Sequence, residues 1–144
     1  MAYYHKIHEP TELRETMRRV NRALRWKERE FTSILCTGQS GIVPSAVVAT
    51  VKGKGLCILR KENEESHSKM GAEGNLSDKY IIIDDFTDSG ATLRRLMAYA
   101  KARGRGLPVY VVLYGSQDKA PCDFRDFTLV PVAKYLYTVG GGSG

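Results

Sequence analysis

Short apolar runs rich in β-branched residues recur along the chain, and segments with helical spacing of apolar residues separate most of them. The runs are Phe31–Cys36, Leu56–Leu59, Tyr80–Ile83 and Val109–Tyr114. Runs that are apolar at nearly every position are typical of strands buried on both faces of a parallel sheet. Helices between successive strands indicate βαβ crossovers. The pattern predicts an α/β domain with three layers, an open, mostly parallel sheet with helices on both faces.

Three segments have the spacing and the end signals of helices. They run from a cap at Thr11 to about Lys27, from Val43 to Val51, and from near Ala91 to a stop before Gly104 or Gly106. The stretch from Pro121 to Val139 adds one or two short strands in this interpretation, and it contains the aromatic residues Phe124 and Phe127.

The connection between Leu59 and Tyr80 breaks the alternation of strands and helices. It is polar, contains Gly71 and Gly74, and has almost no apolar side chains to bury. A polar insertion of this length in a compact domain is typical of a functional lid or of a disordered segment. We expect Glu62–Asp78 to form a mobile lid.

Length and composition favour one domain and argue against several classes of protein. The chain has 144 residues, of which 42% are hydrophobic and 26% charged, and it contains no apolar stretch long enough to span a membrane. We assign residues 1–139 to a single domain and 140–144 to a flexible tail or linker scar. Because no secretory signal is present and the three cysteines lack metal or redox spacing, we expect a cytoplasmic protein without a membrane partner.

Much of the net charge of +6 lies between Arg14 and Arg29, in and just after the first predicted helix. Apolar residues also recur there at helical spacing, so an amphipathic helix with a solvated basic face is favoured over a nucleic-acid contact. Nucleic acid is therefore not an expected partner.

The clearest chemical signal lies in the segment from Tyr80 to Leu93, where a buried strand ends in two carboxylates and a hydroxyl-rich turn opens a helix. Thr87–Thr92 offers backbone N–H groups, hydroxyls and a helix N-terminus, which together suit a phosphate group. Asp84 and Asp85 would repel that phosphate, so they call for ribose hydroxyls or a magnesium ion. The chain has neither a GxxxxGK[ST] loop nor a GxGxxG turn after its first strand. The segment therefore indicates a site for a phosphorylated sugar.

This segment resembles the signature loop of the type I phosphoribosyltransferases, in which hydrophobic residues precede two acids and a Thr/Ser-Gly-x-Thr turn. The resemblance implies the type I phosphoribosyltransferase fold, here with a reduced C-terminal hood, and a site for 5-phosphoribosyl-1-pyrophosphate (PRPP) with Mg²⁺ as cofactor. Asp84 and Asp85 would hold the metal and face the ribose. The residues implied to bind ribose and 5′-phosphate are Asp84, Asp85, Thr87, Asp88, Ser89, Gly90, Ala91 and Thr92.

Two further segments fit the same resemblance. The family places its pyrophosphate-binding loop after the strand equivalent to Phe31–Cys36, often with a cis peptide bond, for which Thr37–Gly38 is the candidate here. An Arg-Lys pair that closes the next strand resembles the corresponding pair of orotate phosphoribosyltransferases. The residues implied to bind pyrophosphate are Thr37, Gly38, Gln39, Ser40, Arg60 and Lys61.

The implied activity is transfer of the 5-phosphoribosyl group to a nitrogenous base, with release of pyrophosphate. Asp88 and His67 are the catalytic candidates, against the alternatives of a helix cap for Asp88 and of a solvent-exposed loop residue for His67. Asp88 favours a purine, whereas the lysine that reads purines in the family would align near Gly115. The expected partners are PRPP and a small-molecule base, and assembly into a homodimer is left open. A regulatory domain that senses PRPP or a nucleotide without catalysis stays open, as does a site for another sugar phosphate.

Overall fold

The computed structural model describes residues 10–60, 72–115 and 120–141. The elements are α1 (Pro10–Ala23), a 3₁₀ turn (Glu28–Glu30), β1 (Ser33–Cys36), α2 (Gly38–Lys52), β2 (Gly55–Leu59), β3 (Ala72–Glu73), β4 (Tyr80–Asp84), α3 (Ala91–Ala102), β5 (Tyr110–Leu113), β6 (Cys122–Asp123), β7 (Phe127–Ala133) and β8 (Leu136–Gly141). Among the helices of these ranges, none combines the length and the apolar character that crossing a membrane requires.

All strands belong to one mixed sheet with the order β3-β2-β1-β4-β5-β8-β7-β6. The central strands β2, β1, β4 and β5 are parallel, and antiparallel strands flank them on both sides. The connection from β1 leads to β2 on one side, and the chain then returns across β1 to form β4 on the other. The predicted α/β class is confirmed, and the order of strands reverses direction between β1 and β4.

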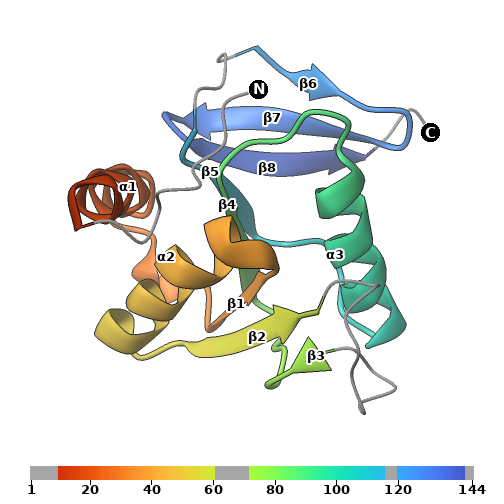
Figure 1. The fold of residues 1–144 in the computed structure, drawn as a ribbon. Helices are drawn as coiled ribbons and strands as arrows, with labels where there is room; N and C mark the ends of the chain where they lie inside the picture. The colour runs from red at the N-terminus through yellow and green to blue at the C-terminus, as the bar shows by residue number, and fades with distance from the viewer. Residues whose placement is uncertain (1–9, 61–71, 116–119, 142–144) are drawn as a thin grey trace.

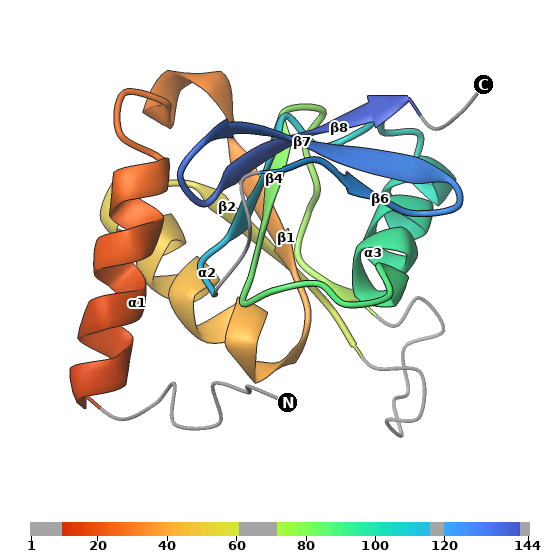
Figure 2. The ribbon, with the colours of Figure 1, turned by 90° about the horizontal axis from the view of Figure 1, so that it is seen from above.

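Helices cover both faces of the sheet (Figures 1 and 2), as the sequence predicts. Side chains of β4 alternate between the two faces, because successive residues of a strand point in opposite directions. Ile81 and Ile83 pack in the cluster that contains residues of α1 and α2. Tyr80 and Ile82 pack in the cluster that contains residues of α3. A strand buried on both faces therefore explains the unbroken apolar run before Asp84.

The boundaries of α1 and α2 differ from the sequence prediction, and Thr11, the expected cap of α1, lies inside the helix, which begins at Pro10. Helix α1 ends at Ala23 rather than near Lys27, and Trp26 then adopts a left-handed conformation (φ 67°). Helix α2 begins at Gly38, not at Val43, and contains Pro44. A proline inside a helix leaves the carbonyl four residues earlier without its usual N–H partner. Here the hydroxyl of Tyr114 donates a hydrogen bond of 2.7 Å to that carbonyl, which belongs to Ser40.

The C-terminal segment forms three strands rather than one or two. Strand β8 pairs with β7 as far as Gly141, which lies opposite Phe127. The ordered ladder thus extends two residues past the expected end of the domain at residue 139, and residues 142–144 lie outside the described part of the chain. Backbone pairing needs no side chain, so glycines at 140 and 141 extend the strand.

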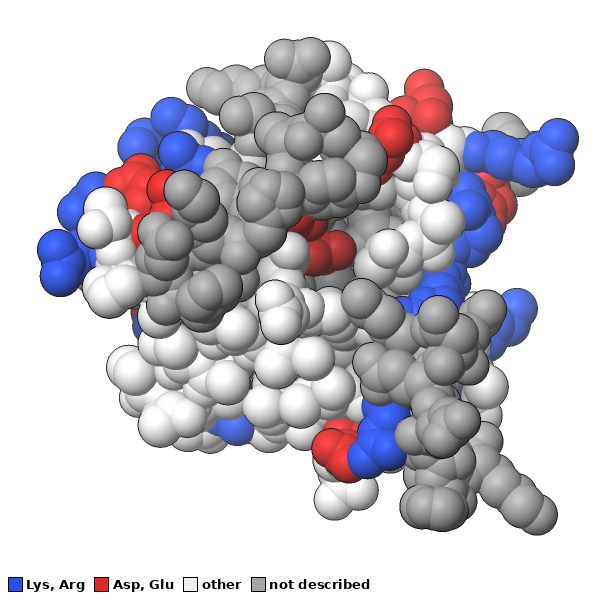
Figure 3. Space-filling model, in the orientation of Figure 1, with Lys and Arg blue, Asp and Glu red and all other residues white. Residues whose placement is uncertain are grey.

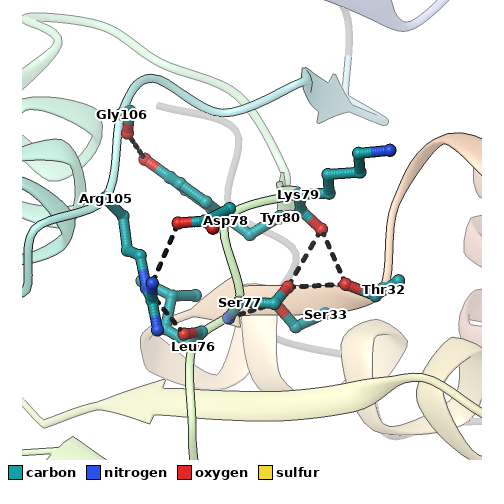
Figure 4. Close-up of polar contacts among 9 residues, drawn as sticks. All are labelled: Thr32, Ser33, Leu76, Ser77, Asp78, Lys79, Tyr80, Arg105 and Gly106. Carbon is teal, nitrogen blue, oxygen red and sulfur yellow. Dashed lines mark hydrogen bonds and ion pairs between the residues drawn. The ribbon is translucent and has the colours of Figure 1, made fainter.

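The last part of the expected lid is anchored to the sheet. Residues of β3 pair with β2, and Ser77 hydrogen-bonds to the hydroxyls of Thr32 and Ser33 at 2.7 and 2.6 Å. Arg105 donates to the carbonyl of Leu76 and to the carboxylate of Asp78, both at 2.9 Å (Figure 4). Residues 72–78 thus have strand-pairing and hydrogen-bond partners in the sheet, and the mobility of the lid stays a prediction. The expected lid residues before them, with Lys61 and His67, lie outside the described residues.

Candidate functional site

The candidate site lies where the parallel strands end. Thr37 follows β1, Arg60 follows β2, and the acids at positions 84 and 85 stand at the end of β4. Ligands of open α/β sheets bind outside the carboxyl ends of the strands at the point where strand order reverses, and here that point lies between β1 and β4. Figure 3 shows acidic side chains recessed in a hollow between α2 and α3, with basic side chains along α3 beside it. The structure thus brings the two loops identified in the sequence to one edge.

Asp84 and Asp85 are both buried, at 9% and 8% exposure. One carboxylate oxygen of Asp84 accepts the N–H of Asp85 at 2.9 Å, and one of Asp85 accepts the N–H of Phe86 at 2.8 Å. No basic side chain of the described residues pairs with either acid. Burial, together with the charge of Asp85, raises the pKa of Asp84 to about 8. The negative charge of the two carboxylates is therefore not balanced by a basic side chain of the described residues.

The turn from Thr87 to Thr92 leads into α3. Gly90 is the N-cap in a left-handed conformation (φ 79°), and no side chain caps the helix there. The hydroxyl of Ser89 accepts the N–H of Ala91 at 3.3 Å. Ser89 and Thr92 are exposed and Thr87 is partly exposed. Hydroxyls and N–H groups are thus available at a helix N-terminus, which favours anion binding.

Asp88 is exposed in this turn and makes no hydrogen bond to any described residue. The alternative of a helix cap for Asp88 is therefore wrong, because the cap position belongs to Gly90. Its catalytic role stays a prediction.

The turn after β1 begins at Thr37, the N-cap of α2, whose hydroxyl donates to the carbonyl of Leu59 at 2.6 Å instead of capping the helix. Gly38 has φ 69°, and the Thr37–Gly38 peptide bond is trans, unlike the cis bond that the family resemblance suggested. A Cβ at Gly41 would lie 3.0 Å from the carbonyl oxygen of Ile83. The glycine therefore lets α2 pack closely against the end of β4, beside the acids.

Two arginines lie at the end of β2. Arg60, expected at the pyrophosphate, forms an ion pair with Glu73 of β3. Arg95 of α3 donates to the carbonyl oxygen of Arg60 and to the hydroxyl of Thr37, both at 2.8 Å. Arg95 is not among the residues predicted from the sequence, although adjacent arginines in the first turns of a helix that follows a phosphate turn are a signal that points to it.

The chain is similar in sequence to a phosphoribosyltransferase and to a transcriptional regulator, and similar in fold to several solved structures. No family model matches the chain. A xanthine-guanine phosphoribosyltransferase of Nitratidesulfovibrio vulgaris is 28% identical over 72% of this chain and 76% of its own length. The transcriptional regulator GfcR of Methanothrix thermoacetophila is 28% identical over 78% of this chain and 57% of its own length.

Three solved structures share the architecture. Orotate phosphoribosyltransferase from Aeropyrum pernix has a TM-score of 0.56 at 11% identity and covers 74% of this chain. Adenine phosphoribosyltransferase from Thermoanaerobacter pseudethanolicus has a TM-score of 0.55 at 15% identity and covers 74% of this chain. Purine phosphoribosyltransferase from Pyrococcus horikoshii has a TM-score of 0.52 at 18% identity and covers 76% of this chain. The chain has a type I phosphoribosyltransferase fold. It spans 58%, 70% and 78% of these three structures, respectively.

The antiparallel strands β6 to β8 correspond to the reduced hood expected from the resemblance to the phosphoribosyltransferases, and we refer to them as the hood. Phe124 and Phe127 pack against each other at 4.8 Å between ring centroids, and a Cβ at Gly90 would lie 2.9 Å from the ring of Phe124. Arg94 donates to the carboxylate of Asp126 at 2.9 and 3.0 Å and to the carbonyl of Ser89 at 3.3 Å. The hood therefore rests directly on the phosphate turn.

The backbone around Gly115 leaves no room for a side chain. A Cβ at Gly115 would lie 2.6 Å from the carbonyl oxygen of Asp85, and the N–H of Gly115 donates to that oxygen. A lysine at this position, as the family resemblance would place it in purine-specific members, would displace Asp85. Close packing of the β5 end against Asp85 explains the glycine.

Proposed function

We propose that the chain binds PRPP with Mg²⁺ at the ends of β1, β2 and β4 and transfers its 5-phosphoribosyl group to a nitrogenous base, releasing pyrophosphate. The observation that carries the proposal is the position of two buried carboxylates, Asp84 and Asp85, between two helix N-termini that no side chain caps from the N-cap position. The acids suit the ribose and a cation, and the two N-termini suit the two phosphate-bearing ends of the ligand.

The donor set suits a magnesium ion that arrives with its substrate. No three His, Cys, Asp or Glu residues in the described ranges cluster closely enough to hold a metal by themselves. Mg²⁺ is commonly bound by one or two carboxylates together with substrate phosphates, and Asp84 and Asp85 offer that number. When bound, the ion would neutralise charge on the departing pyrophosphate.

The reaction asks the protein mainly for positioning and electrostatics. The bond from C1 of the ribose to the pyrophosphate oxygen breaks, and a bond from C1 to a nitrogen of the base forms. The turn Thr87–Thr92 would fix the 5′-phosphate, and the turn at Gly38–Ser40 would hold the leaving group with its N–H groups. We infer that Asp88, which is exposed in the phosphate turn and makes no hydrogen bond to a described residue, would accept a proton from the incoming base. This position supports a purine-like acceptor, the substrate class that the name of one relative states.

A regulatory domain that binds PRPP or a nucleotide without catalysis is the second candidate. It is supported by the similarity to the regulator GfcR, whose identity to this chain equals that of the transferase. Among the described residues the hood consists of only three strands, β6–β8, and this small size also fits a domain that does not act on a base.

Calorimetry with PRPP and Mg²⁺, combined with an assay of pyrophosphate release over a panel of purine bases and orotate, tests both candidates. We expect binding and base-dependent release. Asp85→Asn should lose binding of PRPP. Asp78→Asn makes the same chemical change just before the start of β4, at the other end of the strand, and should retain PRPP binding. Binding without release would select the regulatory function. A chain that binds neither PRPP nor nucleotides would refute both candidates.

A further inference from the structure

We propose that Arg95 is a positioning residue that prepares the pyrophosphate side of the site, so that its loss weakens binding of pyrophosphate-bearing ligands and spares binding of 5′-phosphate alone. The inference rests on the proposed function and deepens it. Arg95 is half-buried in α3. Its guanidinium donates to Thr37 at the end of β1 and to the carbonyl of Arg60 at the end of β2. One side chain thus connects a helix to the ends of two adjacent parallel strands.

The bond to Thr37 bears on whether α2 is open to an anion. A threonine at an N-cap commonly accepts a hydrogen bond from the first turn of its helix, which satisfies that N–H group. The hydroxyl of Thr37 instead donates its one proton to the carbonyl of Leu59 at 2.6 Å and accepts from Arg95 at 2.8 Å. No side chain caps α2. Arg95 and Leu59 therefore hold the hydroxyl away from the helix, and the N–H groups of its first turn stay available for a phosphate.

Arg95 also differs from Arg60 in its charge environment. The guanidinium of Arg60 is paired with the carboxylate of Glu73. Both acceptors of Arg95 are uncharged, and it forms no ion pair with any acid in the described residues. Its positive charge therefore lies uncompensated beside the turn that begins at Thr37. A fixed cation at this place favours a ligand group with high negative charge, such as pyrophosphate.

The phosphate turn is arranged independently of these contacts. Arg94, the neighbour of Arg95, bonds to Ser89 and Asp126, and Ser89 bonds to the N–H of Ala91. Loss of the Arg95 side chain would therefore leave the contacts around Gly90 unchanged. This separation predicts a ligand-selective effect, which general destabilisation would not produce.

The test measures binding of inorganic pyrophosphate with Mg²⁺ and, separately, of ribose 5-phosphate by calorimetry. Arg95→Met should weaken pyrophosphate binding by about tenfold or more, the range of a lost charge-assisted hydrogen bond network, and change ribose 5-phosphate binding by less than about twofold. Arg95→Lys keeps the charge but not both bonds, so it should restore part of the loss. Thr37→Val should reproduce the selective loss and Thr37→Ser should not.

Arg103→Met is the matched control, because Arg103 lies just beyond the C-terminal end of α3, is exposed, and its side chain contacts Tyr99. It should leave both affinities unchanged. Equal weakening of both ligands in Arg95→Met, or full pyrophosphate affinity in Arg95→Met and Thr37→Val, would overturn the role of Arg95 while the proposed function stands. A wild-type protein that binds neither ligand would overturn the proposed function and this inference together.

Discussion

The hydroxyl of Tyr114 donates a hydrogen bond of 2.7 Å to the carbonyl oxygen of Ser40, in the first turn of α2. Four residues further along, Pro44 has no N–H to offer that carbonyl. The hydroxyl therefore supplies the donor that Pro44 lacks. It also connects the end of β5 to the turn proposed to bind pyrophosphate. Gly115, the next residue after Tyr114, packs against Asp85.

Tyr114→Phe should lower the free energy of unfolding by about 1–3 kcal/mol, because a backbone carbonyl loses its partner. Urea denaturation measures this change. In a Pro44→Ala background, the N–H at position 44 can serve the Ser40 carbonyl, so the same substitution should cost less. An equal cost in both backgrounds would contradict this account of the bond.

Gly90→Ala should destabilise the protein by about 1–3 kcal/mol through a left-handed backbone and a steric clash and should abolish the rise in melting temperature on adding PRPP. The Cβ would lie 2.9 Å from Phe124 at φ 79°. Gly104→Ala is the matched control, because Gly104 has φ 76° and no atom within 4 Å of a Cβ. The loss of unfolding free energy in Gly90→Ala beyond that in Gly104→Ala measures the steric clash with Phe124. Equal losses in the two variants would show that the hood does not pack tightly against the turn.

Asp84 should make stability depend on pH. Its pKa is raised to about 8 in the folded protein, against about 3.9 for an unfolded aspartate. Between these values the folded state holds a proton that the unfolded state has lost. The free energy of unfolding should therefore fall as pH rises from about 4 to about 8 and level off above that range.

Asp84→Asn removes this titration, so urea denaturation across the same pH range should give a shallower slope than the wild type. Binding of PRPP with Mg²⁺ to the wild type should strengthen over the same range, because the ionised carboxylate attracts the cation. Superimposable pH slopes in the two proteins would mean that Asp84 ionises normally.

Asp88→Asn should lower kcat on the active base and leave PRPP affinity nearly intact, because an acceptor for a proton matters only as the transition state forms. Stability should not change, since Asp88 makes no hydrogen bond to the described residues. Kinetics, PRPP titration and melting temperature are measured on the same preparation. A normal kcat would remove the catalytic role of Asp88 and the preference for a purine with it.

The central strands could be predicted from the sequence because a strand that is buried on both faces needs apolar residues at nearly every position. The four residues Tyr80–Ile83 are apolar without interruption, and the structure buries them all. The start of α2 was missed because Gly38 and Pro44 are poor helix residues by local propensity. Packing of α2 against β4 and the bond from Tyr114 compensate for them.

The sequence by itself determined the class of fold and the chemistry of the turn Asp84–Thr92, since acids, hydroxyls and glycine stand there in one short segment. Tertiary structure alone decided that Arg95 meets Thr37 and Arg60, and that Phe124 rests on Gly90. These partners lie far apart in the chain, and whether they meet depends on how a helix or strand is placed across the sheet. Periodicity reveals which face of an element is buried, but packing of whole elements decides which polar groups meet at the sheet edge.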